Sequence, residues 1–427
     1  MKNVPVRYPT PTLGAGNVTA TYNSSWEKIL GLTLLIDLDN TLLGNDMDVF
    51  LPAYLQRLGR CLAVYAEPGK MIQALMHATQ QMIENNHPTQ TLKDVFDAHF
   101  YPTLHLPYEV PQADLLDFYE HEFGQLRPLT QLRPEAIQLV NEALEKGVRI
   151  AVATNPLFPA TAIHQRLDWA GLSPAKIPFA HITTYETSHF AKPNPAYYAE
   201  ILAYLGWPED PVLMIGDDWE LDIQPAHSLG LTGFWIHENG AEAKHPLPAN
   251  TSTGSVASLL PWLAQTPLAA PVYQTSIATQ ATLRATPAVL STQLADLPPE
   301  RWHIRQSAEQ WSLTEIVCHM RDVELRVNLP RIQQILLEEN PFIAGVDTDA
   351  WVEANHYVNE DGPAAFQAFL ATRLETLSLL DTLTESAWKR PARHAIFGPT
   401  SFQEIGQFMA EHDRLHIRQI HPFVSTK

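Results

Sequence analysis

Four short apolar runs, each bounded by polar residues, stand out in the first part of the chain: 31–36, 148–153, 212–215 and 233–236. A run of this kind is typical of a strand that is buried on both faces of a parallel sheet. Between the runs lie stretches with helical periodicity, among them 134–146, which has Pro near its start and Gly147 after its end, and 194–205. Strands that alternate with helices predict a doubly wound α/β sheet.

The first two predicted strands are separated by about a hundred residues, which is too many for a single crossover connection. Most of the segment 50–125 has helical character, interrupted by Pro and Gly. We therefore expect a helical cap, inserted into the α/β unit at about 44–130. Residues 1–27 lack periodicity and are expected to form an N-terminal tail.

The pattern changes after a stretch at 241–289 that is rich in Ala, Thr, Pro and Ser. Within it, 255–264 is expected to form the last helix of the α/β unit, which would span 28–264, and 265–273 is the predicted linker. Beyond it we find no convincing strand but four helical segments, at roughly 274–296, 312–339, 363–383 and 401–421. They predict a four-helix bundle over 274–427, with one long connection at about 340–362.

Composition narrows the classes of function. At roughly 150 residues per domain, 427 residues suggest about three folding units. The net charge is 28 − 47 = −19, which disfavours nucleic acid and anionic membranes as partners, because both need a basic surface. Two cysteines cannot build a disulfide framework, the first residues do not resemble a signal peptide, and the run 29–36 is too short to span a membrane. We expect a soluble, cytoplasmic protein.

Acidic, hydroxyl and lysine side chains follow the predicted strands, at the edge where open α/β sheets bind ligands. In chain order they are Asp37, Asp39, Thr41, Thr154, Asn155, Lys192, Asp217, Asp218 and Asp222. Clustered carboxylates repel one another and need a cation, and Mg²⁺ favours carboxylate, water and phosphate oxygens. One aspartate can attack phosphorus, and a second, two residues on, can protonate the leaving oxygen. Thr154 and Lys192 could stabilise the phosphoryl oxygens.

These residues resemble the motifs of the haloacid dehalogenase superfamily, in order and spacing, over about 31–262. The resemblance implies Asp37 as the nucleophile and Asp39 as the general acid and base. It implies Mg²⁺ held by Asp37, the backbone carbonyl of Asp39 and Asp217, with Asp218 or Asp222 supporting Lys192 or a metal-bound water. Each acid taken singly could be a helix cap or a surface charge, but four motifs in order at strand ends favour an active site. Asn155 either binds phosphate or caps the next helix.

The second acid, Asp39, distinguishes activities within this superfamily. Its dehalogenases lack an acid at this position, so the resemblance favours a phosphatase that acts on a small phosphorylated metabolite. A phosphonate-cleaving relative would need a cap lysine that forms a Schiff base, and neither Lys70 nor Lys93 lies in a recognisable motif. The cap decides the substrate, so the motifs leave the substrate open.

A second group of candidate residues lies in the predicted bundle. His412 and His416 are spaced i, i+4 and share one helix face, a geometry suited to two metal ligands. His319 is the candidate third ligand, and three imidazoles suit Zn²⁺, Ni²⁺ or Fe²⁺. A chain with 18 histidines contains such pairs by chance. His303, His356 and His394 compete for the third place, and we interpret each as a loop or surface residue.

The bundle resembles the DinB-like four-helix proteins over about 273–424. The resemblance rests on Trp311-Ser-Leu-x-Glu-Ile-x-x-His319, on Phe397-Gly-Pro-x-Ser-Phe, and on Glu411-His412-Asp-x-x-His416-x-x-Gln419. It implies a metal bound by His319, His412 and His416. Some members of that family are thiol-dependent transferases or isomerases. Cys318 projects about 100° away from His319 on the helix and is better explained as a core residue than as a ligand.

The leading hypothesis is thus a Mg²⁺-dependent phosphatase with an attached metal-binding bundle. One alternative is a metal- or thiol-responsive binding or regulatory protein in which the α/β unit is a scaffold. Another is a bifunctional protein whose bundle is a thiol-dependent transferase. The sequence leaves open a homodimer and any coupling between the two halves.

Overall fold

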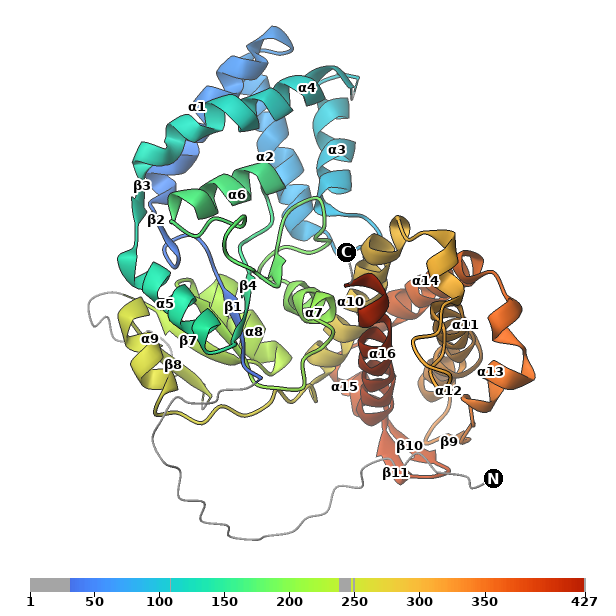
Figure 1. Cartoon of the computed structure of the whole chain (residues 1–427). Coiled ribbons are helices and arrows are strands. Elements are labelled where there is room, and N and C mark those ends of the chain that lie inside the picture. The colour runs from blue at the N-terminus through green and yellow to red at the C-terminus, as the bar shows by residue number, and fades with distance from the viewer. Residues whose placement is uncertain (1–30, 108, 238–246, 249, 426–427) are drawn as a thin grey trace.

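A six-stranded parallel sheet forms the centre of the first half of the molecule, in the order β5-β4-β1-β6-β7-β8 (Figure 1). The computed structural model describes residues 31–107, 109–237, 247–248 and 250–425, so the predicted tail, 1–27, lies outside the described residues. The strands are β1 (Thr33–Ile36), β4 (Arg149–Val152), β5 (His181–Ile182), β6 (Val212–Gly216), β7 (Thr232–Ile236) and β8 (Thr251–Gly254). The predicted doubly wound sheet is confirmed.

Two strands differ from the prediction. Residues 182–185 also favour a strand by sequence (Ile-Thr-Thr-Tyr), but the observed strand ends at Ile182, because the chain turns at Thr184, whose carbonyl accepts the Ser188 N–H at 3.0 Å. We did not predict β8, whose sequence Thr-Ser-Thr-Gly has no apolar run. Because β8 lies at the edge of the sheet, its position does not require a continuous apolar run.

Helices cover both faces of the sheet. α5 (Pro134–Glu145) and α9 (Val256–Leu263) pack on one face, against the side chains of Leu34, Ile150 and Leu213. α7 (Pro195–Tyr204) and α8 (Gln224–Leu229) pack on the other face, against Leu35 and Met214. Successive strand residues therefore point into two separate apolar layers, which explains why each strand is a continuous apolar run.

The cap is inserted between two short strands, β2 (Leu43–Asn45) and β3 (Thr130–Leu132), which pair antiparallel. It contains α1 (Met47–Cys61), α2 (Pro68–Glu84), α3 (Leu92–Thr103) and α4 (Glu109–Asp117), followed by irregular helical turns up to Leu129. In Figure 1 these blue and teal helices lie above the sheet. Helix α6 (Ala160–Trp169), which belongs to the α/β unit, lies between the cap and the sheet.

Four long helical segments form the second half, as predicted. They are α10 (Ser276–Ala295), α11 (Leu313–Val323) with its continuation α12 (Leu329–Leu337), α14 (Gly362–Asp381) and α16 (Phe402–Val424). α11 and α12 are joined by one wide helical turn. The shorter helices α13 (Ala350–Ala354) and α15 (Glu385–Trp388) lie in the connections.

The expectation of no strand in this half was wrong. β9 (Phe342–Ile343), β10 (Pro391–His394) and β11 (Gly398–Ser401) form a three-stranded sheet beside the bundle. Two of these strands have four residues and one has two, so apolar alternation cannot develop far enough to be recognised.

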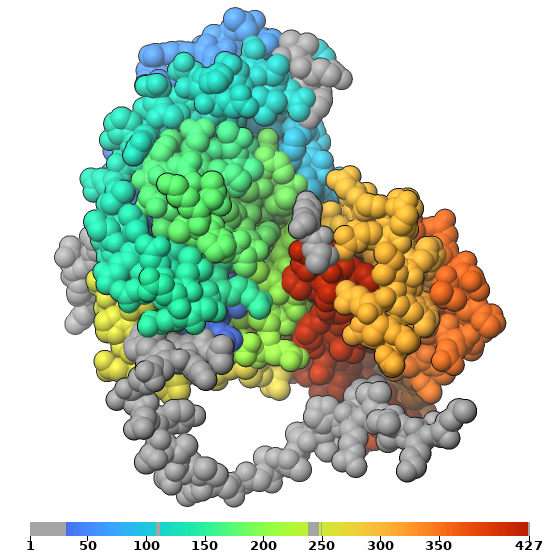
Figure 2. Space-filling model, in the orientation of Figure 1, coloured from blue at the N-terminus to red at the C-terminus, as the bar shows by residue number. Residues whose placement is uncertain are grey.

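The bundle packs directly on the α/β unit. One buried apolar cluster contains alanines of α7 and α10 together, including Ala199, Ala203, Ala281 and Ala285. Small side chains let the two helix backbones approach closely, and Figures 1 and 2 show the bundle lying against the α/β unit along this side. The residues 266–274 contain no helix or strand, and Tyr273 within them stacks edge-on against the Trp207 ring at 5.2 Å. None of the described helices is long and apolar enough to cross a membrane.

Candidate active site and candidate metal centre

Three carboxylates meet at the carboxyl edge of the sheet. Asp37 follows β1, Asp217 follows the neighbouring strand β6, and Asp222 lies in the next helical turn. Because β1 and β6 are paired and parallel, their ends deliver both side chains to the same place. One carboxylate oxygen from each residue lies within 4.8 Å of the others. Asp37 and Asp222 are buried, and Asp217 is partly exposed.

Lys192 is the cation of this cluster. Its Nζ donates to Asp37 Oδ1 at 2.6 Å and to Asp222 Oδ1 at 2.5 Å, and the side chain is buried. The residue lies in the loop between β5 and α7 (183–194), which we call the lysine loop. The backbone N–H of Lys192 donates to the side-chain oxygen of Asn155 at 3.2 Å. Asn155 thus holds the lysine loop in place.

One ammonium group does not balance three clustered acids. Burial raises the pKa of Asp37 well above its usual value, against the opposing effect of Lys192. Burial, with a smaller contribution from Asp222, raises the pKa of Asp217 to about 7. The two carboxylates beside Lys192 outweigh its desolvation and raise its pKa, so it stays charged. Three carboxylates with a single lysine make a site that favours an additional cation.

Asp39 is not one of the three carboxylates of this cluster. It forms an ion pair with the buried guanidinium of Arg166, and its other oxygen accepts from Asn45 Nδ2 at 2.8 Å. Arg166 comes from α6, and its guanidinium carbon lies 5.3 Å from the centre of the Phe158 ring. Sequence reasoning missed Arg166, because an arginine in an amphipathic helix is ordinarily on the surface.

The other predicted residues take different places. Thr154 is buried, and its backbone carbonyl accepts from the Tyr197 hydroxyl at 2.8 Å. The Thr41 hydroxyl is buried without a hydrogen-bond partner among the described residues. Asp218 caps the following helical turn, since its carboxylate accepts from the N–H groups of Glu220 and Leu221. The structure therefore brings Asp37, Lys192, Asp217 and Asp222 into contact, whereas Asp39 and Asp218 have partners of their own.

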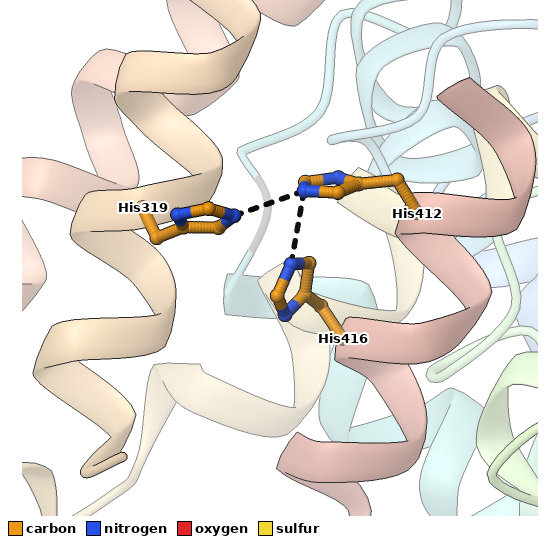
Figure 3. Close-up of side chains that lie close together, drawn as sticks. All are labelled: His319, His412 and His416. Atoms are coloured by element: carbon orange, nitrogen blue, oxygen red, sulfur yellow. Dashed lines mark hydrogen bonds between the residues drawn. The ribbon is translucent and has the colours of Figure 1, made fainter. Parts of the chain in front are cut away.

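A histidine triad lies inside the bundle (Figure 3). His319 from α11 faces His412 and His416 from α16, and the Nε2 atom of His412 lies 3.0 Å from the Nε2 atoms of both other rings. His319 and His416 are buried, and His412 is partly exposed. Among the described residues, these three nitrogens form the second cluster that could hold a metal ion.

Burial keeps the triad neutral. It lowers the pKa of His319 to about 4 and that of His416 to about 3, and it lowers the pKa of His412 well below its usual value. The Nδ1 of His416 lies 2.8 Å from Gln419 Oε1. With the proton on Nδ1, the Nε2 atom carries a lone pair that faces the other rings. Neutral imidazoles with converging lone pairs are the form that binds a transition metal.

The competing histidines lie elsewhere. His303 and His356 are exposed, as we expected of loop or surface residues. For His394 that expectation was wrong. It is buried in β10, where its ring stacks with Phe397 at 4.8 Å and its Nδ1 accepts the Ile396 N–H at 3.2 Å. Cys318 is fully buried, and burial raises its pKa to about 12, which agrees with a core role.

A buried ion-pair network lies directly beside the triad. Arg373 from α14 donates to Glu324 at 2.8 and 2.9 Å and to Asp413, the neighbour of His412, at 2.5 and 3.0 Å. The same guanidinium donates to the Leu283 carbonyl of α10 at 3.0 Å. The network joins three of the four bundle segments to α10.

Comparison with known proteins assigns both halves. The profile of the haloacid dehalogenase-like hydrolases matches residues 32–230, and the profile of the DinB superfamily matches residues 282–420. The chain joins a haloacid dehalogenase-like hydrolase domain to a DinB-superfamily bundle. A zebrafish (Danio rerio) protein described as haloacid dehalogenase-like hydrolase domain-containing protein 3 is 31% identical over 67 residues, which span 16% of this chain and 28% of that relative.

Solved structures are similar to each half. A 2-haloacid dehalogenase from Pseudomonas syringae is 19% identical to the hydrolase half, with a TM-score of 0.41, and covers 56% of this chain and 99% of its own. A phosphatase of the same superfamily from Thermococcus onnurineus is 18% identical, with a TM-score of 0.35, and covers 55% and 98%. YfiT from Bacillus subtilis, described as a probable metal-dependent hydrolase, is 20% identical to the DinB bundle, with a TM-score of 0.32, and covers 37% and 90%.

Proposed function

We propose that the hydrolase domain is a Mg²⁺-dependent phosphatase that cleaves a small phosphorylated metabolite through an aspartyl-phosphate on Asp37. The observation that carries the proposal is the contact of Asp37 with Lys192, inside a cluster of three carboxylates that one lysine cannot neutralise. A nucleophilic carboxylate beside a buried ammonium group suits attack on an anionic phosphoryl group, because the ammonium offsets the repulsion between them.

The donor set fits Mg²⁺. Asp37 and Asp217 offer hard oxygen ligands, and Asp222 completes the cluster while it also binds Lys192. The backbone carbonyl of Asp39 is the further donor implied by the family, in which Asp218 or Asp222 would support Lys192 or a metal-bound water. The bound ion would neutralise the negative charge of the phosphoryl group in this acidic pocket.

The reaction then uses side chains of the chain itself. Asp37 attacks phosphorus, and Asp39 protonates the leaving oxygen and later takes a proton from the water that cleaves the aspartyl-phosphate. Lys192 holds the attacking carboxylate and the phosphoryl oxygens, and Thr154 donates a hydrogen bond to one of these oxygens. Since Asp39 is paired with Arg166, it must turn from that partner toward the leaving oxygen.

A screen of phosphorylated metabolites tests the proposal. Purified full-length protein is assayed for phosphate release with and without Mg²⁺, alongside Asp37→Asn. Asp168→Asn is the matched control, because Asp168 is an exposed aspartate on α6 with no part in the site. We expect release that depends on Mg²⁺, is lost in Asp37→Asn and is retained in Asp168→Asn. No release from any substrate, or equal release by Asp37→Asn, would reject the phosphatase.

The DinB bundle is proposed to bind one divalent transition metal, Zn²⁺, Ni²⁺ or Fe²⁺, through His319, His412 and His416. The proposal rests on three neutral rings whose Nε2 atoms converge: that of His412 lies 3.0 Å from each of the other two. Metal analysis of the purified protein should give about one ion per chain, and His412→Ala should lose it. His303→Ala, in an exposed histidine of the same half, is the control. Equal metal content in all three proteins would reject the triad as the ligand set.

A further inference from the structure

The lysine loop of the hydrolase domain is covered by the cap. The N–H of Leu92 donates to the Ser188 carbonyl at 2.8 Å, and the N–H of Lys93 donates to the Tyr185 carbonyl at 2.8 Å. The start of α3 is therefore bonded through its backbone to the loop that carries Lys192. A buried apolar cluster of Met82, Leu92, Val95 and Ala191 seals the same contact, with Ala191 directly before Lys192.

A second contact comes from the turn that joins α2 to α3 (85–90), which we call the cap turn. Asn85 Nδ2 donates to the His189 carbonyl at 2.8 Å, and Asn194 Nδ2 donates to Asn86 Oδ1 at 3.2 Å. These bonds reach the lysine loop on both sides of Lys192. The position of the cap turn is thus tied to the position of the catalytic lysine.

The bundle holds the cap turn from outside. Arg284 of α10 donates from Nη1 to the Asn86 carbonyl at 2.7 Å, and its Nη2 forms an ion pair with Asp381 at the end of α14. Arg284 is 6% exposed, so its charge lies buried between the bundle and the cap turn. Desolvation, then Arg284, then His189 lower the pKa of His87, so groups of both the bundle and the lysine loop act on the cap turn.

α10 itself is fixed to the α/β unit, because its alanines pack against those of α7, the helix that follows the lysine loop. Arg284 therefore extends from a helix with a fixed position to an inserted cap, whose chain connections to the α/β unit are the two short strands β2 and β3. A cap held on such connections can move as a body unless something restrains it. The side chain of Arg284 supplies that restraint from outside the hydrolase domain.

We propose that Arg284 of the DinB bundle is a positioning residue for the hydrolase site, which holds the cap turn against the lysine loop and so fixes the cap over Lys192. The inference deepens the proposed phosphatase and rests on it for its effect on turnover. The restraint on the cap turn is a separate physical claim that does not need any substrate.

Hydrogen–deuterium exchange of the full chain measures the restraint. In Arg284→Met we expect exchange at 85–95 and 184–194 to rise at least tenfold, with α11 and α16 unchanged. Arg301→Met is the matched control, because Arg301 also donates to a backbone carbonyl, that of Phe423, but within the bundle. No rise at these segments in Arg284→Met, or an equal rise in Arg301→Met, would overturn the proposal.

Two further measurements complete the test. If Arg284→Met exchanges faster throughout the chain, Asn86→Ala serves as the second variant. It keeps the backbone carbonyl that Arg284 contacts but loses the side-chain bond to Asn194. We expect hydrogen exchange in Asn86→Ala to rise selectively at 184–194, and a rise throughout the chain, or none, would overturn the proposal. With p-nitrophenyl phosphate and Mg²⁺, Arg284→Met should lower kcat/KM at least tenfold, whereas Arg284→Lys retains more of it; unchanged kcat/KM would also overturn it. A wild type that releases no nitrophenol would reject the phosphatase, and the exchange data would still decide the role of Arg284.

Discussion

Arg373→Met should destabilise the protein strongly, because it removes the guanidinium that bonds two buried carboxylates. Glu324 is 0% exposed and Asp413 is 1% exposed, and each accepts two hydrogen bonds from Arg373. Removal of one partner from a buried ion pair costs about 3–5 kcal/mol. Glu324 would respond by taking up a proton. From the ordinary value of 4.5, protonation at pH 7 costs roughly 1.4 × 2.5 ≈ 3.5 kcal/mol, which agrees with that range.

The sign of the pH dependence follows from this proton. In the variant the folded-state pKa of Glu324 lies above its unfolded value, so the penalty is largest at neutral pH and falls as the pH approaches 4.5. Thermal unfolding at pH 7 should occur roughly 3–6 °C below wild type, at about 1.1 °C per kcal/mol for a cooperative unit of 427 residues, and the gap should narrow by pH 5.

The matched control is Arg393→Met, in an exposed arginine of β10, which should lie within about 0.5 kcal/mol of wild type. A further Glu324→Gln substitution in Arg373→Met should recover part of the loss, since it removes one of the two unpaired charges. A loss below about 1 kcal/mol for Arg373→Met, or a loss that is the same at pH 5 and pH 7, would refute the electrostatic explanation.

Three more outcomes are expected. Lys192→Met should reduce phosphate release at least about 100-fold while circular dichroism is unchanged; near-normal turnover would remove the lysine from the mechanism. Gly206→Ala places a Cβ 2.8 Å from the His421 ring at φ +74°, so its melting temperature should fall below that of Gly147→Ala, which has a similar φ of +75° but open space around it; equal melting would show that this contact is unimportant. Burial lowers the pKa of His181 to about 4, so its neutral ring supports the fold fully above pH 6.5 and loses up to roughly 3 kcal/mol as the pH falls toward 4. His181→Phe should therefore lose less stability than the wild type between pH 6.5 and pH 4 and unfold at a lower pH. An unchanged pH midpoint of acid unfolding would contradict this.

Residues delivered by regular elements were predictable from the sequence. Asp37 and Asp217 follow apolar runs, and parallel strands bring their ends together, so the cluster follows from topology. His412 and His416 follow from helix periodicity. In contrast, the partner of Asp39 is an arginine 127 positions away, and no local pattern marks it. The burial of His394 depends on Phe397 and Phe408, which a hairpin and a distant helix bring together.

Contacts between the halves escaped prediction for the same reason. α7 is buried at every position from Ala196 to Ala203, and the sequence alone assigns such a helix to the interior of one domain. The structure shows that α10, across the predicted linker at 265–273, packs against this helix in one buried cluster. Periodicity reveals that a face is apolar but not which element covers it.

The shared apolar layer of α7 and α10 determines whether the two halves are independent of each other. A hydrolase domain released from its bundle would carry an apolar stripe on α7 into water, and a released bundle would carry the matching stripe on α10. Neither half is an interchangeable module: substitutions that suit one surface must be matched on the other. The two halves should therefore melt together as one cooperative unit.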